Sequence, residues 1–425
     1  MTAFLVAVFV GVLLLGLPVA FGMGVLALVY LLAAGDFSLM TIPQKMVTGM
    51  DSFLLLAIPF FLLAGGLMNA GGITRRLVDF ATTLVGHIHG GLGHVTVVAN
   101  MIMSGMSGSA AADAAATGSV LIPGMVRQGY SRGFAAAISA SAATMGPIIP
   151  PSIAFVIFGS LTGVSIGELF VAGFLPGLLM GVYLMVTCWL IARRRGYGAA
   201  ASRASAGDIG RAFLRAGPAM LTPVIVLGGM VAGVVTPTEA AALAVLYSLV
   251  LGLLYRELSW GAMPAMLTEV VVTTSVVYLL LGVFNLVGWV LAVEQIPQAV
   301  TTGFLSLTDD WRLVLLVINV MVFALGIPIE PVPLLIILGP MLIPVVAKYG
   351  IDPVHFGVVF VFNVVLSVIT PPVGTNMFIT CSIAKCSMGE FARESWPFIA
   401  ALVLLLLVLT YVPAITLFLP RLLLR

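Results

Sequence analysis

Long stretches without a charged residue are the feature that most limits what this chain can fold into. Several can hold about 20 apolar residues, the length that crosses a bilayer as a helix. They cover residues 1–35, 52–74, 133–167, 169–192, 216–238, 270–293, 353–384 and 395–420. Because apolar and polar residues do not alternate as in barrel strands, the stretches indicate helices. With shorter runs added, we expect an all-α polytopic membrane protein with about 10 to 13 embedded segments.

The composition excludes several classes of protein. The chain is 61% hydrophobic and 8% charged, whereas a soluble domain has about 25% charged residues. A net charge of +2 offers no basic surface for nucleic acid. Cys188, Cys381 and Cys386 form no CxxC pair, so a disulfide framework and common zinc knuckles are excluded. No P-loop motif is present, so the chain cannot itself use ATP.

A basic segment lies near the middle of the chain. Residues 193–215 contain six arginines and one aspartate, which the positive-inside rule places in the cytoplasm. A solvated linker is the simpler interpretation, with lipid binding as the alternative. The N-terminal stretch lacks a basic start and a cleavage site, so we expect a first span that is retained.

The two halves of the chain share landmarks at a nearly constant spacing, which indicates an internal duplication. We expect a first repeat over 1–196, a basic cytoplasmic linker over 197–210 and a second repeat over 211–425. Transporters are often built from two inverted repeats around a midplane site. The matching landmarks are Leu121-Ile122-Pro123 with Leu342-Ile343-Pro344, Pro150-Pro151 with Pro371-Pro372, Gly167-Glu168 with Gly389-Glu390, Pro176 with Pro397, Pro18 with Pro237, and Ile73 with Ile296.

Each repeat contains a helix that its prolines should interrupt. We expect broken helices at about 133–163 and 353–384, with the breaks in 141–155 and 367–378. Unwound backbone leaves carbonyl groups free, and these survive in a membrane only inside protein, at a cavity or on an ion. Carbonyl and hydroxyl oxygens suit a small hard cation such as sodium. The alternative is a simple proline kink.

A second interrupted segment precedes each broken helix. Residues 103–124 are rich in glycine, serine and alanine, and residues 326–344 contain closely spaced prolines. We expect re-entrant helical hairpins with tips near residues 107–109 and 326–331. Two hairpin tips facing two helix breaks would present helix N-termini to a carboxylate and carbonyl groups to cations.

Ionisable residues in apolar surroundings are the next candidates. Asp113 and Glu330 lie in the hairpins and could bind a cation or a substrate hydroxyl, or only cap a helix. Glu239 is a third candidate, although Thr236 and Glu239 also fit a capping box. His87, His89 and His94 lack an accompanying carboxylate or cysteine, so a metal site there is disfavoured. Segments 73–84 and 296–307 are predicted to be amphipathic arms or ordinary loop helices.

Five segments of the sequence resemble one known family, and the resemblance extends over essentially the whole chain. The family is the large membrane subunit of TRAP transporters, the tripartite ATP-independent periplasmic transporters. The segments are MSGSAAADAAATGSVLIPGM, ATMGPIIPPS, GVVTPTEAAA, ITPPVGTN and GELFVAGFLPG.

The resemblance implies a sodium-driven, binding-protein-dependent transporter with an elevator-type fold in the bacterial inner membrane. Its partners would be a small four-helix membrane subunit, expected as a separate chain, and a soluble periplasmic substrate-binding protein. The substrate would be an organic acid such as a dicarboxylate, sialic acid or another sugar acid. No cofactor is expected, and sodium ions would be the coupling ions.

The resemblance also implies site residues. The first sodium site would use Ser107, Gly108, Ser109, Thr144 and Gly146. The second would use Gly326, Pro328, Thr370, Gly374 and Thr375. The substrate carboxylate would lie near Ser109, Ser152, Thr375 and Asn376.

Three other functions are compared with this interpretation. A stand-alone sodium-coupled carrier would share the hairpins and breaks but need no binding protein. An intramembrane enzyme would need a catalytic motif such as HExxH or paired carboxylates, and the sequence has none, so we expect no enzymatic activity. A channel would not need paired hairpins, and its flux would ignore a sodium gradient.

Overall fold

The computed structural model describes residues 11, 19–35, 37–261 and 263–424. Every regular element in these ranges is a helix. The expected first span within 1–35 lies largely outside the described residues, which begin their first continuous helix at Val19.

The helices follow one another with short connections. The first half contains α2 (Val19–Ala34), α3 (Thr41–Met50), η1 (Phe53–Leu56), α4 (Ala57–Ala70), α5 (Ile73–Val85), α6 (Gly91–Ser107), α7 (Ala110–Arg127), α8 (Arg132–Ala143), α9 (Ile153–Thr162) and α10 (Ile166–Arg195). The second half contains α11 (Ala206–Val231), α12 (Pro237–Leu254), α13 (Met263–Val293), α14 (Ile296–Leu307), α15 (Trp311–Gly326), α16 (Pro331–Lys348), α17 (Pro353–Leu366), η2 (Ser367–Ile369), α18 (Thr375–Ala384), α19 (Met388–Tyr411) and α20 (Pro413–Leu423).

The lengths of these helices suit a membrane. Among the described residues, seven helices are long and apolar enough to span a bilayer, and shorter apolar helices accompany them. The chain is therefore an all-α polytopic membrane protein, as predicted.

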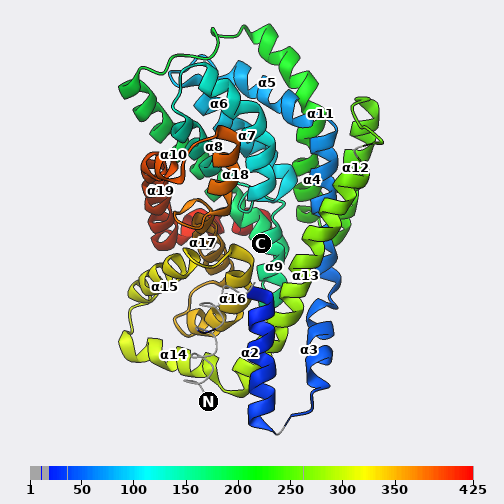
Figure 1. Ribbon diagram of the computed structural model, residues 1–425, viewed down its shortest axis with the longest axis vertical. Helices are drawn as coiled ribbons and strands as arrows, with labels where there is room; N and C mark the ends of the chain where they lie inside the picture. The colour runs from blue at the N-terminus through cyan, green and yellow to red at the C-terminus, as the bar shows by residue number, and fades with distance from the viewer. Residues whose placement is uncertain (1–10, 12–18, 36, 262, 425) are drawn as a thin grey trace.

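The two halves repeat the same order of elements. A short helix, a hairpin of two helices, a broken helix and a long helix occur as α5 to α10 and again as α14 to α19. Figure 1 shows α5, α6 and α7 towards one end of the molecule and α14, α15 and α16 towards the other. This opposite placement is the arrangement that inverted repeats produce.

The hairpins are longer than the sequence predicts. Their arms are α6 with α7, covering 91–127, and α15 with α16, covering 311–348. The predicted segments 103–124 and 326–344 contain each tip and most of the second arm. The first arms were missed because they look like ordinary apolar helix.

The predicted helix breaks are present in both repeats. Between α8 and α9, residues 144–152 are not helical, and between η2 and α18, residues 370–374 are not helical. The Pro150–Pro151 and Pro371–Pro372 peptide bonds are both cis. Proline lacks the N–H that a continuous helix needs, which explains why both breaks fall on proline pairs.

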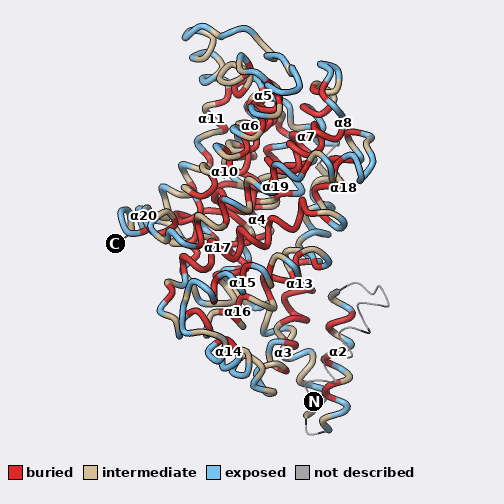
Figure 2. Tube along the Cα trace, turned by 90° about the vertical axis from the view of Figure 1, so that its left-hand side faces the viewer, coloured by how far each residue is buried: buried red, intermediate tan, exposed pale blue. Residues whose placement is uncertain are grey.

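The core lies where the two repeats meet. Figure 2 shows buried chain running through the middle of the molecule, around α4, α17 and α19. The rings of Phe158, Phe356 and Phe360 pack together there, with the first from α9 and the other two from α17. Helices α2, α3 and α4 pack against α12 and α13, and buried residues of α2, α4, α12 and α13 continue this core.

The connection between the halves is shorter than the predicted linker over 197–210. It covers residues 196–205, because Ser205 and Asp208 form a capping box that begins α11 at Ala206. Its first residues are fixed to the first half, since Gly90 N–H donates to the Tyr197 carbonyl and Ala200 N–H to the Gly86 carbonyl.

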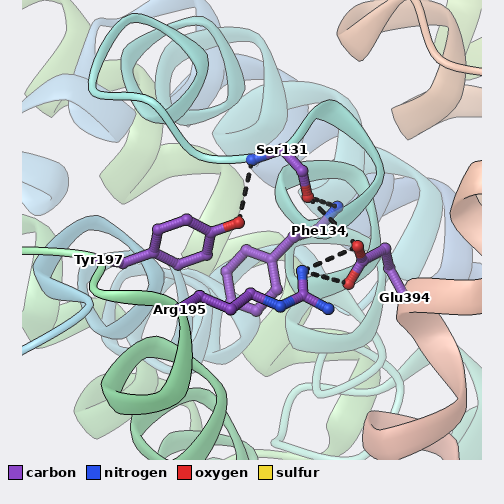
Figure 3. Close-up of polar contacts among 5 residues, drawn as sticks. All are labelled: Ser131, Phe134, Arg195, Tyr197 and Glu394. Atoms are coloured by element: carbon purple, nitrogen blue, oxygen red, sulfur yellow. Dashed lines mark hydrogen bonds and ion pairs between the residues drawn. The ribbon is translucent and has the colours of Figure 1, made fainter.

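Side chains reinforce this attachment (Figure 3). The Arg195 guanidinium donates to Glu394 of α19 at 2.8 Å. The Ser131 N–H donates to the Tyr197 hydroxyl at 3.2 Å. The Tyr197 ring stacks on Tyr130 with centroids 4.3 Å apart and lies against Phe134. The start of the linker therefore belongs structurally to the group that contains the hairpins.

Candidate functional site

The tip of the first hairpin lies directly against the first helix break. The tip is residues 108–109, between α6 and α7, and Gly108 has a positive φ of 64°. A Cβ atom on Gly108 would lie 2.6 Å from the Pro151 carbonyl oxygen. A Cβ atom on Gly146 would lie 2.7 Å from Asp113 Oδ2 and 3.1 Å from the Ser109 carbonyl oxygen. Glycine at both positions thus allows backbone and carboxylate oxygens to converge.

Asp113 is fully buried behind this tip. Its Oδ1 accepts a hydrogen bond from Ser107 Oγ at 2.5 Å, and its Oδ2 accepts one from Ser104 Oγ at 3.3 Å. The carboxylate lies in the first turn of α7, where the positive end of the helix dipole favours a negative charge.

The second hairpin meets the second break in the same way. A Cβ atom on Gly326 would lie 2.8 Å from Ser367 Cβ. A Cβ atom on Gly374 would lie 2.5 Å from the Val368 carbonyl oxygen. The Ser367 and Thr370 hydroxyls donate to backbone carbonyl groups of α17, so their lone pairs remain as acceptors.

Both tips, the first break and the residues that flank the second break line one cavity of about 300 Å³. The first residues of four helices contribute to its wall, namely those of α7, α9, α16 and α18. The other walls come from α13, α17 and α4. A helix N-terminus carries a partial positive charge, and those of α7, α9 and α18 also present backbone N–H groups, whereas Pro331 and Pro333 of α16 have none. Together these helix ends make the cavity favourable for an anion.

The cavity has no positively charged side chain among its described lining residues. Its one ionisable lining residue in the described chain is Glu330, which is exposed and makes no capping bond to α16. An anion bound here would therefore be balanced by helix dipoles and by cations brought in from solution.

Among the residues that the structure describes, two buried amide oxygens have no hydrogen-bond partner. They are Asn376 Oδ1, beside the cavity, and Asn363 Oδ1, on α17. Asn376 also links the two repeats, because its Nδ2 donates to the Ala140 carbonyl of α8 at 3.3 Å. A buried oxygen without a partner costs free energy, which a bound cation or hydroxyl would recover.

The structure brings together most of the residues predicted for the sites. Gly108, Ser109, Thr375 and Asn376 line the cavity, and Glu330 does too. Gly146 and Gly326 lie at the tip-to-break contacts described above, Ser107 donates to Asp113 behind the first tip, and Gly374 lies against Val368 within the second break. Thr144 is buried in the first break, and its hydroxyl donates to the Ser141 carbonyl.

Other predicted residues lie apart from the cavity wall. Ser152 is buried, caps α9 and donates its hydroxyl to the Pro147 carbonyl. Pro328 is exposed in the turn between α15 and α16. Glu239 is exposed and forms the predicted capping box with Thr236, so the structure gives it a capping role.

Some wall residues could not be identified from the sequence. Thr273 of α13 lines the cavity, but it lies with Thr274 and Ser275 in a helix without a break, so its sequence does not mark it as part of a site. Ser367 lies inside the predicted second break. Its contact with Gly326 depends on how the second hairpin packs against that break, which the sequence does not show.

Within the described residues, no group of three or more histidine, cysteine, aspartate or glutamate side chains could hold a metal ion. His87 and His89 are exposed, whereas His94 is buried in α6.

Comparison with known proteins agrees with this description. The family described as "Tripartite ATP-independent periplasmic transporter, DctM component" matches residues 6–415. The sialic acid TRAP transporter large permease protein SiaM of Vibrio cholerae is 41% identical, over 97% of this chain and 96% of that protein. The isethionate TRAP transporter permease protein DctMQ of Oleidesulfovibrio alaskensis is 40% identical, over 96% of this chain and 64% of that protein.

A solved structure has the same fold. The YdaH transporter of Alcanivorax borkumensis matches with a TM-score of 0.63, over 87% of this chain and 86% of that chain. Its sequence identity is 17%, so this likeness concerns the fold alone.

Proposed function

Because this chain belongs to the DctM component family of the tripartite ATP-independent periplasmic transporters, we propose that it is a sodium-driven transport subunit that imports an organic acid. As a large permease of this family it is a multi-pass protein of the inner membrane. Sodium coupling, the elevator motion, the substrate class and the separate partners make up the proposal.

The observation that carries the proposal is the cavity lined by four helix N-termini and no positively charged side chain. Helix N-termini bind a carboxylate or another anionic group through backbone N–H groups. A site without a fixed cation holds an anion best when mobile cations bind beside it. This makes substrate binding depend on the coupling ion.

Sodium would bind on either side of the substrate, where each hairpin tip meets a helix break. At the first contact the available ligands are the carbonyl oxygens of Ser109 and Pro151, with Asp113 behind them. At the second they are the Val368 carbonyl and the hydroxyls of Ser367 and Thr370. Oxygen ligands of this kind suit a hard cation.

The energy available from sodium is sufficient. Two sodium ions carried with one monovalent acid move one net charge inward, and 100 mV supplies about 2.3 kcal/mol for it. Each tenfold sodium gradient adds about 1.4 kcal/mol per ion, whereas a hundredfold substrate gradient costs about 2.8 kcal/mol.

The motion would be an elevator movement of one helix group against another. The moving group would contain both hairpins, both broken helices, α10 and α19, which pack together. The stationary group would contain α2, α3, α4, α11, α12 and α13, of which α4 and α13 contribute to the cavity wall. A small membrane subunit would enlarge the stationary group, and a periplasmic binding protein would deliver the substrate.

The substrate is proposed to be an organic acid. The two relatives above are named for sialic acid and for isethionate, and both compounds are organic anions. A cavity of about 300 Å³ with apolar and hydroxyl-bearing walls has room for a small acid and not for a large one.

Reconstitution tests the function. The chain would be placed in proteoliposomes with its small subunit, its binding protein and a labelled organic acid selected by that binding protein. We expect uptake only with an inward sodium gradient, and none when potassium replaces sodium. Uptake by the chain alone would support the stand-alone carrier, and flux that ignores sodium would support a channel.

A further inference from the structure

A second cavity, of about 440 Å³, lies outside the candidate transport site. Its walls come from α3 and α13 on one side and from α9, α14 and α16 on the other. Most of its lining is apolar, including Leu161, Ile336, Ile337 and Met341. Thr48 and Gly288 at its edge are exposed, so the cavity opens to the outside of the chain.

One positive charge faces this cavity. The Lys45 ammonium lies over the Trp289 ring, 5.8 Å from its centroid, and makes no salt bridge within the described part of the chain. No carboxylate occurs among the described lining residues. The Asn285 amide donates to the Lys45 carbonyl, and the Thr48 hydroxyl donates to the Gln44 carbonyl. Both bonds use backbone carbonyl groups, so neither involves the Lys45 ammonium.

The length of α13 and the side chains near its end indicate that this cavity lies near the membrane surface. Helix α13 has 31 residues and is about 46 Å long, which exceeds the roughly 30 Å hydrocarbon core. Trp289 is about 6 Å from the end of this helix, and paired tryptophan and lysine side chains are typical of the membrane interface. In Figure 1, α3 and α14 lie at the end opposite the basic linker, so this is the non-cytoplasmic side.

We propose that this cavity binds a membrane phospholipid, with its phosphate on Lys45 and one acyl chain against the apolar wall of α16. The charge matches a phosphodiester, and the apolar wall matches hydrocarbon. An organic acid with several polar groups would leave those groups without partners on this wall. The lipid would fill the space between α13 and α16, where the two helix groups approach each other.

Native mass spectrometry of the full chain, purified in a mild detergent, tests the proposal. We expect the wild-type chain to retain the mass of one phospholipid. An exposed ion pair contributes up to about 1 kcal/mol, so Lys45→Gln should lower the ratio of lipid-bound to lipid-free chain about fivefold. Lys348→Gln is the matched control, because Lys348 is exposed at the end of α16 and does not line the cavity.

A second pair of variants tests the apolar part without changing charge. Gly288 and Gly303 both have open space around their Cα atoms and are exposed on helices, but only Gly288 lines the cavity. Gly288→Phe should fill the cavity and remove the lipid, whereas Gly303→Phe should retain it. Equal retention by all variants, or a wild-type chain without bound phospholipid, would overturn the proposal. The experiment measures bound lipid and not transport, so its result does not depend on whether the proposed function is correct.

Discussion

At the scale of single residues, two glycines hold the first hairpin tip against the first helix break. Gly108 and Gly146 face oxygen atoms at distances that a methyl group could not tolerate. The same absence of side chains brings the Ser109 carbonyl and Asp113 close to the break. The geometry that lets oxygens converge thus depends on residues with no functional group of their own.

Gly146→Ala should therefore damage transport. The new methyl group would displace Asp113 or the tip backbone, at a cost of about 1–3 kcal/mol. We expect sodium-driven uptake into proteoliposomes to fall about tenfold or more while the chain still folds. Gly228→Ala is the control, because Gly228 is exposed on α11 with open space around it. Wild-type uptake by Gly146→Ala would contradict this account of the tip.

Asp113→Asn keeps the shape of the side chain and removes its charge. Hydrogen bonds to a charged group contribute about 1.5–3 kcal/mol, and 1.4 kcal/mol corresponds to tenfold in affinity. We expect the sodium concentration for half-maximal uptake to rise about tenfold or more. Asp79→Asn, on the exposed face of α5, should leave it unchanged. An unaltered sodium dependence in Asp113→Asn would remove this carboxylate from the proposed ion site.

At the scale of elements, the linker attachment joins α10, α8 and α19. The Tyr197 ring lies against Tyr130 and Phe134, and its hydroxyl accepts from Ser131 N–H. Because the attachment ends near Ala201, only the following residues up to Ser205 are left to connect the two helix groups.

Tyr197→Ala should release the linker. Loss of the aromatic contacts is expected to destabilise the attachment by about 3 kcal/mol, whereas Tyr197→Phe keeps the ring and loses about 1 kcal/mol with the hydroxyl. Limited trypsin digestion measures the release as faster cleavage after Arg203. Equal cleavage rates in wild type and Tyr197→Ala would show that the aromatic contacts do not hold the linker.

Proline and glycine explain why much of the fold could be predicted. The pairs Pro150-Pro151 and Pro371-Pro372 dictate a local break whatever surrounds them, so both breaks were predicted from the sequence. The arms of the hairpins were cut short, since 91–102 and 311–325 have no such signal. Thr273 was missed because its place in the cavity depends on how α13 packs against the tips.

At the scale of the whole molecule, the cavity lies between two helix groups. Thr273 of α13 and Ala111 of the first hairpin line it from different groups, whereas Ala154 and Val365 line it from α9 and α17 within one group. An elevator movement changes the distance between Thr273 and Ala111 and preserves the distance between Ala154 and Val365. A channel that opens without this movement would change neither distance.

Two cysteine pairs distinguish these alternatives. After the three native cysteines are replaced, Thr273→Cys with Ala111→Cys places one thiol on each group, and Ala154→Cys with Val365→Cys places both on the proposed moving group. With a bifunctional thiol reagent that spans the cavity and is reducible, we expect the first pair to lose sodium-driven uptake and to regain it on reduction. Because the reagent occupies the cavity in both cases, steric block would inhibit both pairs alike, whereas trapping of the movement inhibits the first alone. Full uptake by the crosslinked first pair would mean that α13 and the hairpin need not separate during transport, and the elevator part of the proposed function would then be wrong.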